Sequence, residues 1–441
     1  MQQRRISRRD FLQTTGTVSL AALLSGCFGV GGQSGGGSGA QSIIVWDISN
    51  GNDQKLIQDI TAKFNQSHPS IHATVQFFQN DPYKQKLQVA MGAHQPPDIF
   101  FGWGGGILKS YIDAGDVYDL TPDLNADPAW RDRFLPSSLG AATFNNHIYG
   151  IPNDGVQPVV FLYNKDIFEK YKLSIPQTWG DLLNLVKTVR QHGLQPIALG
   201  GASKWTYLMY EMYLVDRLGG PQVFDAIMAN QPNAWSNPVI IKANTMIQDL
   251  VAAGAFGSGF ASVSYDTGQA SALLYTGKAA MHLMGTWDFG TITNDDPAFI
   301  QQGKLGWFPF PAVEGGVGDP SNLTGVPCNY YSVAKTSKAI QACVTYLKDA
   351  VLNDEAVDRR IALGEIPPIK GIENKLSNAP HSDWLLFVYR LVQKAAHFQL
   401  AWDQALPPQP AQALLTNLDQ LFLRQISPQQ FSANMNQTIG T

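Results

Sequence analysis

The sequence predicts an α/β protein built as two lobes. Its 441 residues are too many for one small core and suit two units. Between residues 42 and 101, apolar runs alternate with helical patterns in the order β-α-β-α-β, and a similar order begins again after residue 152. Hydrophobic residues make up 44% of the chain and charged residues 15%, the ordinary balance of a soluble globular protein.

The first lobe is expected to contain three strands and two helices before residue 102. An apolar run at 42–46 predicts the first strand, and a polar turn follows it. Helical periodicity at 53–64 and again at 83–91 surrounds a second strand at 72–77. The third strand, 97–101, ends in Gly-Trp-Gly, and loops at the carboxyl ends of such strands face ligands.

The second lobe repeats the alternation with more helices. Further strands are expected at 159–163, 280–284, 305–311 and 330–334. From residue 337 onward the pattern is mostly helical. Helices are expected at 166–171, 178–192, 205–218, 221–228 and 238–252.

The N-terminus has the features of an export and anchoring segment. Residues 7–13 (SRRDFLQ) resemble the twin-arginine export signal, and 14–24 form an apolar stretch too short to span a bilayer. Leu24-Ser25-Gly26-Cys27 resembles the lipobox of bacterial lipoproteins. We therefore expect a signal peptide at 1–26, lipidation of Cys27 and a Gly-rich linker over 27–41. The alternative is a plain signal peptide with a chance Cys.

Charge and cysteine content exclude several classes of partner. Without residues 1–26 the chain carries 27 basic and 34 acidic residues, a net charge of −7, so nucleic acid is not an expected partner. No His/Cys cluster has zinc-ligand spacing, and no cofactor or metal is expected. Cys328 and Cys343 could form a disulfide or remain buried thiols.

Several segments together resemble the extracytoplasmic solute-binding proteins of carbohydrate ABC importers, the family that includes maltose-binding protein. Each motif alone is weak or moderate, but six in family order cover nearly all of 42–441. Only the 427–430 segment departs from the pattern, with Gln430 in place of the usual acid. The matching segments are 97–100 (PDIF) with 111–120, 149–152 (YGIP), 162–168 (LYNKDIF), 176–182 (PQTWGDL), 277–281 with 285–287 (GTW), and 427–430 (SPQQ).

This resemblance implies a type II periplasmic-binding-protein fold, with hinge-linked lobes that close over a ligand. By analogy the N-terminal lobe takes 42–150 plus 291–335, and the C-terminal lobe takes 151–290 plus 336–441. The implied partners are a sugar or oligosaccharide, the transmembrane subunits of the importer, and the membrane through the lipid. The implied state is an extracytoplasmic monomer tethered to the outer face of the cytoplasmic membrane.

A sugar site needs aromatic platforms and side chains that bond adjacent hydroxyls. Trp287 in the Gly-Thr-Trp motif is the first candidate, because the resemblance places a stacking residue there, although a Trp that packs the hinge is the alternative. Structural roles are also open for Trp46, Trp402 and Glu365, and Asp98 is expected to brace a loop. The full set of candidates is Trp46, Asp47, Trp103, Asn153, Asp154, Trp205, Trp287, Asp288, Trp402 and Asp403.

Binding without catalysis is therefore the expected function, and no catalytic residue is assigned. A glycoside hydrolase is the rival among enzymes, but no carboxylate pair in the sequence can be assigned the required separation. An anchored adhesin does not need two α/β lobes. Among binding functions, a polyamine, phosphodiester or peptide ligand stays open, although several Trp at strand ends favour a carbohydrate over a phosphate.

Overall fold

The structure is a computed structural model that describes residues 40–440. Residues 40–441 make up one compact unit of the chain. The predicted signal peptide, Cys27 and nearly all of the linker lie outside the described residues. Within the described part, no helix is long and apolar enough to cross a membrane.

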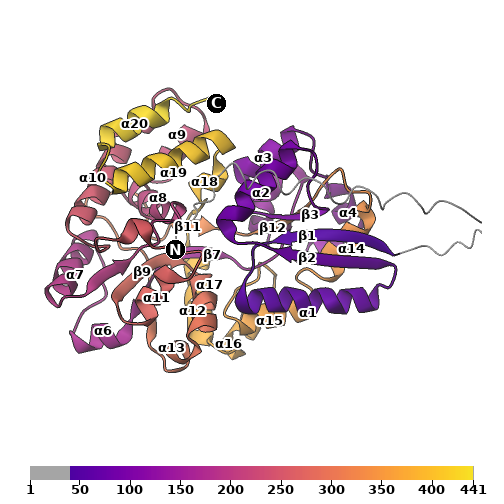
Figure 1. Cartoon of the computed structure of the whole chain (residues 1–441), viewed down its shortest axis with the longest axis horizontal. Coiled ribbons are helices and arrows are strands. Elements are labelled where there is room, and N and C mark those ends of the chain that lie inside the picture. The colour runs from indigo at the N-terminus through magenta and orange to yellow at the C-terminus, as the bar shows by residue number, and fades with distance from the viewer. Residues whose placement is uncertain (1–39, 441) are drawn as a thin grey trace, which may run out of the picture. The chain divides into compact units, whose positions relative to one another are not determined.

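The first sheet has the strand order β2-β1-β3-β12-β6 (Figure 1). β1 (Gln41–Asp47) is parallel to β2 (Ile71–Phe77) and to β3 (Ile99–Gly102). β12 (Tyr330–Val333) and β6 (Ile151–Pro152) complete it, with β12 antiparallel to both neighbours. Helices α1 (Gly51–Ser67) and α2 (Asn80–Gly92) connect the parallel strands, whose carboxyl ends therefore meet at one edge.

The second sheet is built around β7 (Gln157–Asn164) and β9 (Ala279–Gly285), which are antiparallel. The order is β13-β11-β7-β9-β8, and β10 also pairs with β7. Every residue of β9 is buried, as expected for a strand covered on both faces. The outer strands are β8 (Gln195–Ala198), β10 (Leu305–Phe308), β11 (Leu323–Val326) and β13 (Phe398–Leu400).

Helices cover both sheets. α8 (Trp205–Gly219) is buried from Thr206 to Gly219, so it forms the centre of the second core rather than a surface layer. α7 (Trp179–Gln191) begins with a capping box between Thr178 and Asp181, which fixes its start.

The remaining elements are one hairpin and a set of helices that complete the two layers. The short strands β4 (Thr143–Phe144) and β5 (His147–Ile148) form the hairpin. The other helices are α3 (Gly105–Asp113), α4 (Thr121–Ala126), α5 (Pro128–Arg131), α6 (Lys165–Lys170), α9 (Gln222–Met228), α10 (Pro238–Ala252), α11 (Gln269–Tyr275), α12 (Asp288–Asp295), α13 (Pro297–Gln301), α14 (Ile340–Asp349), α15 (Asp354–Ala362), α16 (Glu373–Asn378), α17 (Ser382–Lys394), α18 (Trp402–Ala405), α19 (Pro408–Phe422) and α20 (Pro428–Asn436).

The α/β class is confirmed, and the predicted strands and helices form close to their expected bounds. In two places, the lobe predicted for a segment is not the lobe of the sheet on which that segment lies. β10 and β11 lie within 291–335, yet they belong to the second sheet because both pair antiparallel with β7. α14 and α15 lie within 336–441, yet they pack on the first sheet and on α1. The lobe boundaries themselves stay a prediction.

Two short segments carry the chain between the sheets and lie side by side. One, 153–156, joins β6 to β7, and the other, 327–329, joins β11 to β12. The Asn153 backbone N–H donates to the Asn329 carbonyl at 3.0 Å, and the Val156 N–H donates to the Ile366 carbonyl at 2.9 Å. The first hydrogen bond joins the two crossing segments to each other, and the second joins segment 153–156 to the loop after α15.

Cys328 and Cys343 are buried, free thiols. The sequence allowed either a disulfide between them or two buried thiols, and the structure has two buried thiols. Burial raises the pKa of Cys343 to about 12, which keeps that thiol protonated at neutral pH.

Candidate functional site

A cavity of about 620 Å³ lies between the two sheets. Its first wall comes from the ends of β1, β2 and β3, through residues 48–54, 77–80 and Trp103. Its second wall comes from the start of α8, the loop before α11, and Trp287 with one face of α12. The volume falls within the roughly 300–1,000 Å³ typical of small-molecule sites.

The second wall is aromatic. The rings of Trp205 and Trp287 lie 6.1 Å apart at 53°, and Tyr265 packs edge-on against Trp205 at 5.2 Å. Trp287 follows β9 directly, and Gly285 leaves room for its ring, because a Cβ built on Gly285 would lie 1.9 Å from Trp287 Cζ3. Such rings offer flat apolar faces to the C–H side of a ligand.

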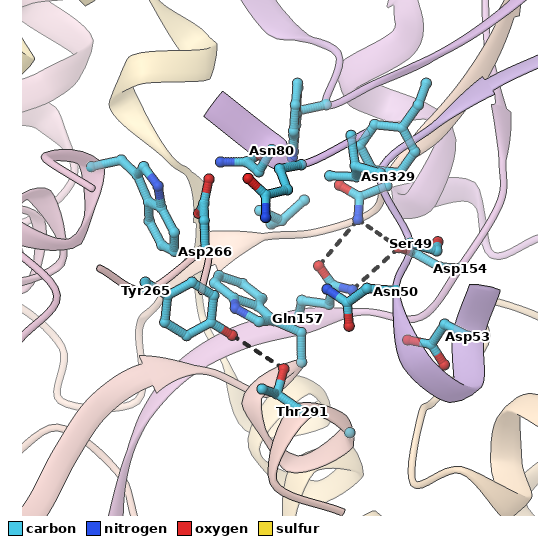
Figure 2. A pocket seen from close by; sticks show the side chains of 18 of the residues that line it. Ser49, Asn50, Asp53, Asn80, Asp154, Gln157, Tyr265, Asp266, Thr291 and Asn329 are labelled. Atoms are coloured by element: carbon cyan, nitrogen blue, oxygen red, sulfur yellow. Dashed lines mark hydrogen bonds between the residues drawn. The ribbon is translucent and has the colours of Figure 1, made fainter. Parts of the chain in front are cut away.

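The opposite wall is polar (Figure 2). Asn329 Nδ2 donates to Asp154 Oδ2 at 2.6 Å, and Gln157 Nε2 donates to the same oxygen at 3.2 Å. Asp154 Oδ1 and Asn329 Oδ1 are shielded from solvent and have no hydrogen-bond partner in the described part of the chain. Asp53, in the first turn of α1, lies on the same side of the pocket as Asp154. A carboxyl group and two amides thus line this wall, and such groups can form hydrogen bonds with the hydroxyls of a ligand.

The ionisable side chains that line the cavity are mostly carboxyl groups. Burial raises the pKa of Asp154 to about 7, and it also raises the pKa of Asp53, with the nearby Glu365 carboxylate as the next cause. Burial likewise raises the pKa values of Asp266 and Asp403. An acidic wall of this kind favours uncharged or cationic ligands over anions.

Lys84 bridges the two walls from α2. Its Nζ lies 3.8 Å from Asp403 Oδ2 and 4.0 Å from Asp81 Oδ1. It also lies 5.1 Å from the ring centroid of Trp103 and 5.9 Å from that of Trp205. The Asp81 backbone N–H donates to Asp266 Oδ2 at 3.1 Å. The first turn of α2 therefore connects the first wall to the second.

Five of the predicted site residues line the cavity and five do not. The lining residues Trp103, Asp154, Trp205, Trp287 and Asp403 come together from five separate parts of the chain.

Asp47 and Asp288 are fully buried behind the walls, and each holds a lining segment. Asp47 accepts hydrogen bonds from the Tyr331 hydroxyl and from the Ser49 N–H, so it fixes the loop after β1. Asp288 accepts from the Tyr265 hydroxyl at 3.3 Å.

The other three residues outside the lining are Trp402, Trp46 and Asn153. Trp402 is 2% exposed and stacks on Phe224 at 4.4 Å and 2°, a core position. Trp46 lies under Lys86, whose Nζ is 4.7 Å from its ring centroid. Asn153 is 3% exposed within the crossing segment.

Other expectations can be compared directly with the contacts. Asp98 braces a loop, because it accepts from the Ile44 N–H at 2.8 Å and from the Ser337 hydroxyl at 2.6 Å. Within the 162–168 segment, Asn164 also has a structural contact, because it caps α6 by accepting from the Ile167 N–H at 3.3 Å. Both side chains therefore have structural contacts.

Sequence reasoning missed several lining residues. Asn50 precedes α1 and Asp53 lies in its first turn, both shortly after the end of β1, so the rule about strand ends could have found them. No comparable signal marks the other three lining residues. Lys84 lies on a helix, Tyr265 in an irregular loop and Asn329 in a crossing segment. No group of three or more His, Cys, Asp or Glu residues among 40–440 could hold a metal ion.

Two α/β sheets joined by crossing segments, with a cavity at their strand ends, define a two-lobed ligand-binding protein. The family model for bacterial extracellular solute-binding proteins matches residues 49–356, and the chain belongs to this family. The fold is the type II periplasmic-binding-protein fold, as the resemblance implied.

Three similar proteins illustrate the relationship. An uncharacterized ABC transporter extracellular-binding protein of Pyrococcus horikoshii is 28% identical over 63% of this chain and 64% of its own length. The multiple sugar-binding protein of Streptococcus mutans is 23% identical over 67% of this chain and 68% of its own. A structure from work on xylan utilization by the thermophilic bacterium Caldanaerobius polysaccharolyticus has a TM-score of 0.81 and 30% identity, covering 90% of this chain and all of that one. The match thus spans less than two thirds of the Pyrococcus protein.

Proposed function

We propose that the protein is the substrate-binding component of an ABC importer, and that it captures a sugar or oligosaccharide by cleft closure and delivers it to a membrane permease. The observation that carries this proposal is a cavity with Trp205, Tyr265 and Trp287 on one wall and the carboxyl and amide side chains of Asp154, Gln157 and Asn329 on the other. A sugar has apolar C–H faces and a rim of hydroxyls, and this arrangement matches both.

The similar proteins support this ligand class. The Streptococcus mutans relative is named as a multiple sugar-binding protein, and the structure at 30% identity comes from work on xylan utilization. The family is one of binding proteins, which supports binding without turnover as the activity of this chain. Closure is then a shift toward the state in which both walls contact the ligand.

The place of action follows from the N-terminal sequence. An export signal, a lipidated Cys27 and a Gly-rich linker would tether a monomeric receptor to the outer face of the cytoplasmic membrane, next to its permease. A twin-arginine signal also favours export of the folded protein.

A ligand screen tests the proposal. Purified protein is heated with xylo-oligosaccharides, chitin oligosaccharides, raffinose and stachyose, and with spermidine and a tripeptide as non-sugar controls. We expect one sugar class to raise the melting temperature, with no product detected by chromatography afterwards. Turnover of a glycoside would refute binding without catalysis, and a rise with spermidine or the peptide alone would refute the sugar class.

A further inference from the structure

Helix α3, which follows the last parallel strand of the first sheet, packs directly on α18 of the second lobe. On α3, Leu108 belongs to the core of β1 and β3, whereas on α18, Trp402 and Ala405 belong to the core of β7 and β9. Ile107, next to Leu108, packs against the second core instead. One turn of α3 therefore contacts the cores of both lobes.

Two glycines at the start of α3 allow this close packing. A Cβ built on Gly106 would lie 2.4 Å from the Ala405 carbonyl oxygen and 2.6 Å from the Leu406 carbonyl carbon. A Cβ built on Gly105 would lie 2.5 Å from the Gln404 carbonyl oxygen. Real Cβ atoms essentially never come within 3.0 Å of another atom, and a backbone atom cannot swing away as a side chain can. The backbones of α3 and α18 therefore meet here with no side chain between them.

Backbone conformation accounts for only one of these glycines. Gly105 has a φ of +64°, in the left-handed region that favours glycine. Gly106 does not have a positive φ, and within a helix glycine is less favourable than alanine. The missing side chain at residue 106 therefore serves the approach of α18 rather than the helix itself.

Polar contacts join the same two lobes beside the glycines. Lys84 Nζ, on α2, lies 3.8 Å from Asp403 Oδ2 on α18. The Asp81 N–H, in the first turn of α2, donates to Asp266 Oδ2 at 3.1 Å. Both contacts, like the packing of the glycines, are between protein groups, so none of them needs a ligand in order to form.

We propose that the packing of α3 on α18 is a closing contact between the lobes that forms without ligand, and that Gly106 is a positioning residue for closure. This inference rests on the proposed function, because it concerns closure of the same cleft. Trp103, just before α3, and Asp403 and Gln404 on α18 line the cavity, so the contact lies directly beside the site. Part of the free energy of closure then comes from the protein alone, and the closed state is populated before a ligand arrives.

The test is the distance between the lobes in ligand-free protein, measured by electron paramagnetic resonance between two spin labels. Val89, on α2, and Met228, at the end of α9, are exposed and lie on helices of the first and second lobe. Both are replaced by Cys for labelling in a chain that also carries Cys27→Ser. Cys328 and Cys343 are buried, so the labels attach at the two chosen positions.

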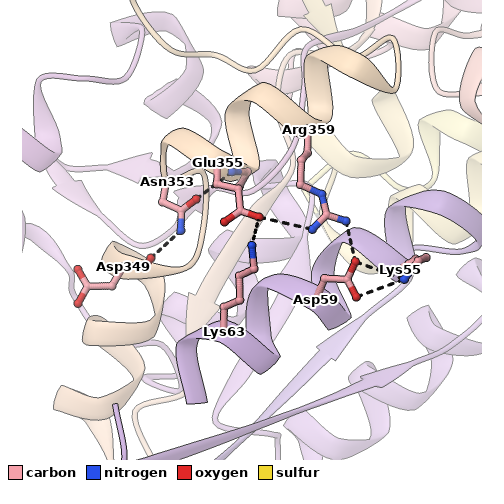
Figure 3. A network of polar contacts seen from close by, with 8 residues as sticks. Lys55, Asp59, Lys63, Asp349, Asn353, Glu355 and Arg359 are labelled. Atoms are coloured by element: carbon pink, nitrogen blue, oxygen red, sulfur yellow. Dashed lines mark hydrogen bonds and ion pairs between the residues drawn. The ribbon is translucent and has the colours of Figure 1, made fainter. Parts of the chain in front are cut away.

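The labelled parent chain should contain a population at the short separation of the closed structure. Gly106→Ala should reduce this population and lengthen the main distance, because the added methyl group overlaps the α18 backbone. Its melting temperature should change by only a few degrees, because both cores stay intact. Gly140→Ala, where a Cβ meets nothing within 4 Å, should match the parent. So should Arg359→Met, which breaks an ion pair with Asp59 in the network of α1 and α15 within the first lobe (Figure 3).

Affinity for sugars gives a second readout. Apparent affinity falls in proportion to the population of the binding-competent state, so a closed population reduced to one tenth weakens binding about tenfold. Gly106 does not line the cavity, so Gly106→Ala should weaken binding of every sugar by the same factor. Calorimetry with xylotriose, triacetylchitotriose and raffinose measures that factor. A factor that differs strongly between sugars would indicate a change within the site and contradict the inference.

The distances decide the inference whether or not a sugar is found. It is overturned if the parent has no closed population without ligand, or if Gly106→Ala loses stability while its distances stay unchanged, since the contact is then fixed packing. If Gly106→Ala does not fold, Ile107→Ala must lengthen the distance, and an unchanged distance overturns the inference. If no probe binds but Gly106→Ala lengthens the distance, the proposed function fails while the closing contact stands.

Discussion

Replacing Gly285 by Ala should move the Trp287 ring and so test the aromatic wall without changing a ligand-contacting side chain. A Cβ at residue 285 would lie 1.9 Å from Trp287 Cζ3 and 2.2 Å from Cε3 and Cη2, whereas ordinary contacts begin near 3.4 Å. The ring is the far end of a side chain that borders the cavity, so it can swing away. Backbone strain is not expected, because residue 285 lies in a strand and does not have a positive φ.

The expected loss is that of one aromatic contact. An aromatic stack or hot spot contributes roughly 1–3 kcal/mol, so sugar affinity should fall about 5- to 150-fold. Trp287→Ala should weaken binding by a similar few kcal/mol. The free energy of unfolding of Gly285→Ala should stay within about 1 kcal/mol of the wild type, since Ala is no worse than Gly inside a strand.

Calorimetric titration with a sugar that binds measures the affinity. Thermal unfolding of the free protein measures the free energy of unfolding. Gly102→Ala is the matched control, because it also lies at a strand end and a Cβ there meets nothing within 4 Å. If a crystal structure of Gly285→Ala showed the ring displaced while affinity equalled that of the wild type, Trp287 would not be a platform and the reasoning would be refuted.

Three further predictions concern parts of the molecule outside the aromatic wall. Burial raises the pKa of Glu211 from 4.5 to about 8. The free energy of unfolding of the wild type should therefore fall as the pH rises from 4.5 to about 8. Glu211→Gln should therefore match the wild type near pH 4 and exceed it by about 3 kcal/mol at pH 7 in calorimetry; a constant difference would contradict this. Trp402→Ala should cost about 3–5 kcal/mol of stability because Trp402 stacks in the core, and chemical denaturation showing less than 1 kcal/mol would count against that placement. Cys27→Ser should shift the exported protein from the detergent phase to the aqueous phase in a phase-partition assay, whereas equal partition of both proteins would refute lipidation.

Local pattern was enough to predict most elements of this fold. The apolar run at 42–46 and the helical periodicity at 238–252 correspond to β1 and α10, because burial on one or both faces leaves a period in the sequence. β8, β11 and β13 were missed, because they are three or four residues long and contain at most one aromatic residue each. The equally short β3, β10 and β12 contain two aromatic residues each and were predicted.

Assignment of segments to sheets could not be predicted from the same patterns. β10 looks like an ordinary strand in the sequence, and only antiparallel pairing with β7 places it and β11 in the second sheet. Pairing depends on contacts between residues more than 100 positions apart, about which local periodicity says nothing.

The sequence likewise predicts some residues of the candidate site and misplaces others. Trp103 and Trp287 directly follow strands, and the rule that ligands lie at strand ends identifies both from the sequence. Trp402 was also a candidate, but its ring stacks on Phe224 in the core, because position along the chain does not fix side-chain direction.

By itself, the sequence determined the α/β class, the family and several aromatic residues of the cavity, because strand periodicity, strand-end residues and family motifs are local features. Only the tertiary structure brought Tyr265, Asn329 and Lys84 to the cavity. The ion pair of Lys84 with Asp403 joins residues more than 300 positions apart. Such a contact depends on proximity that exists only after the chain has folded.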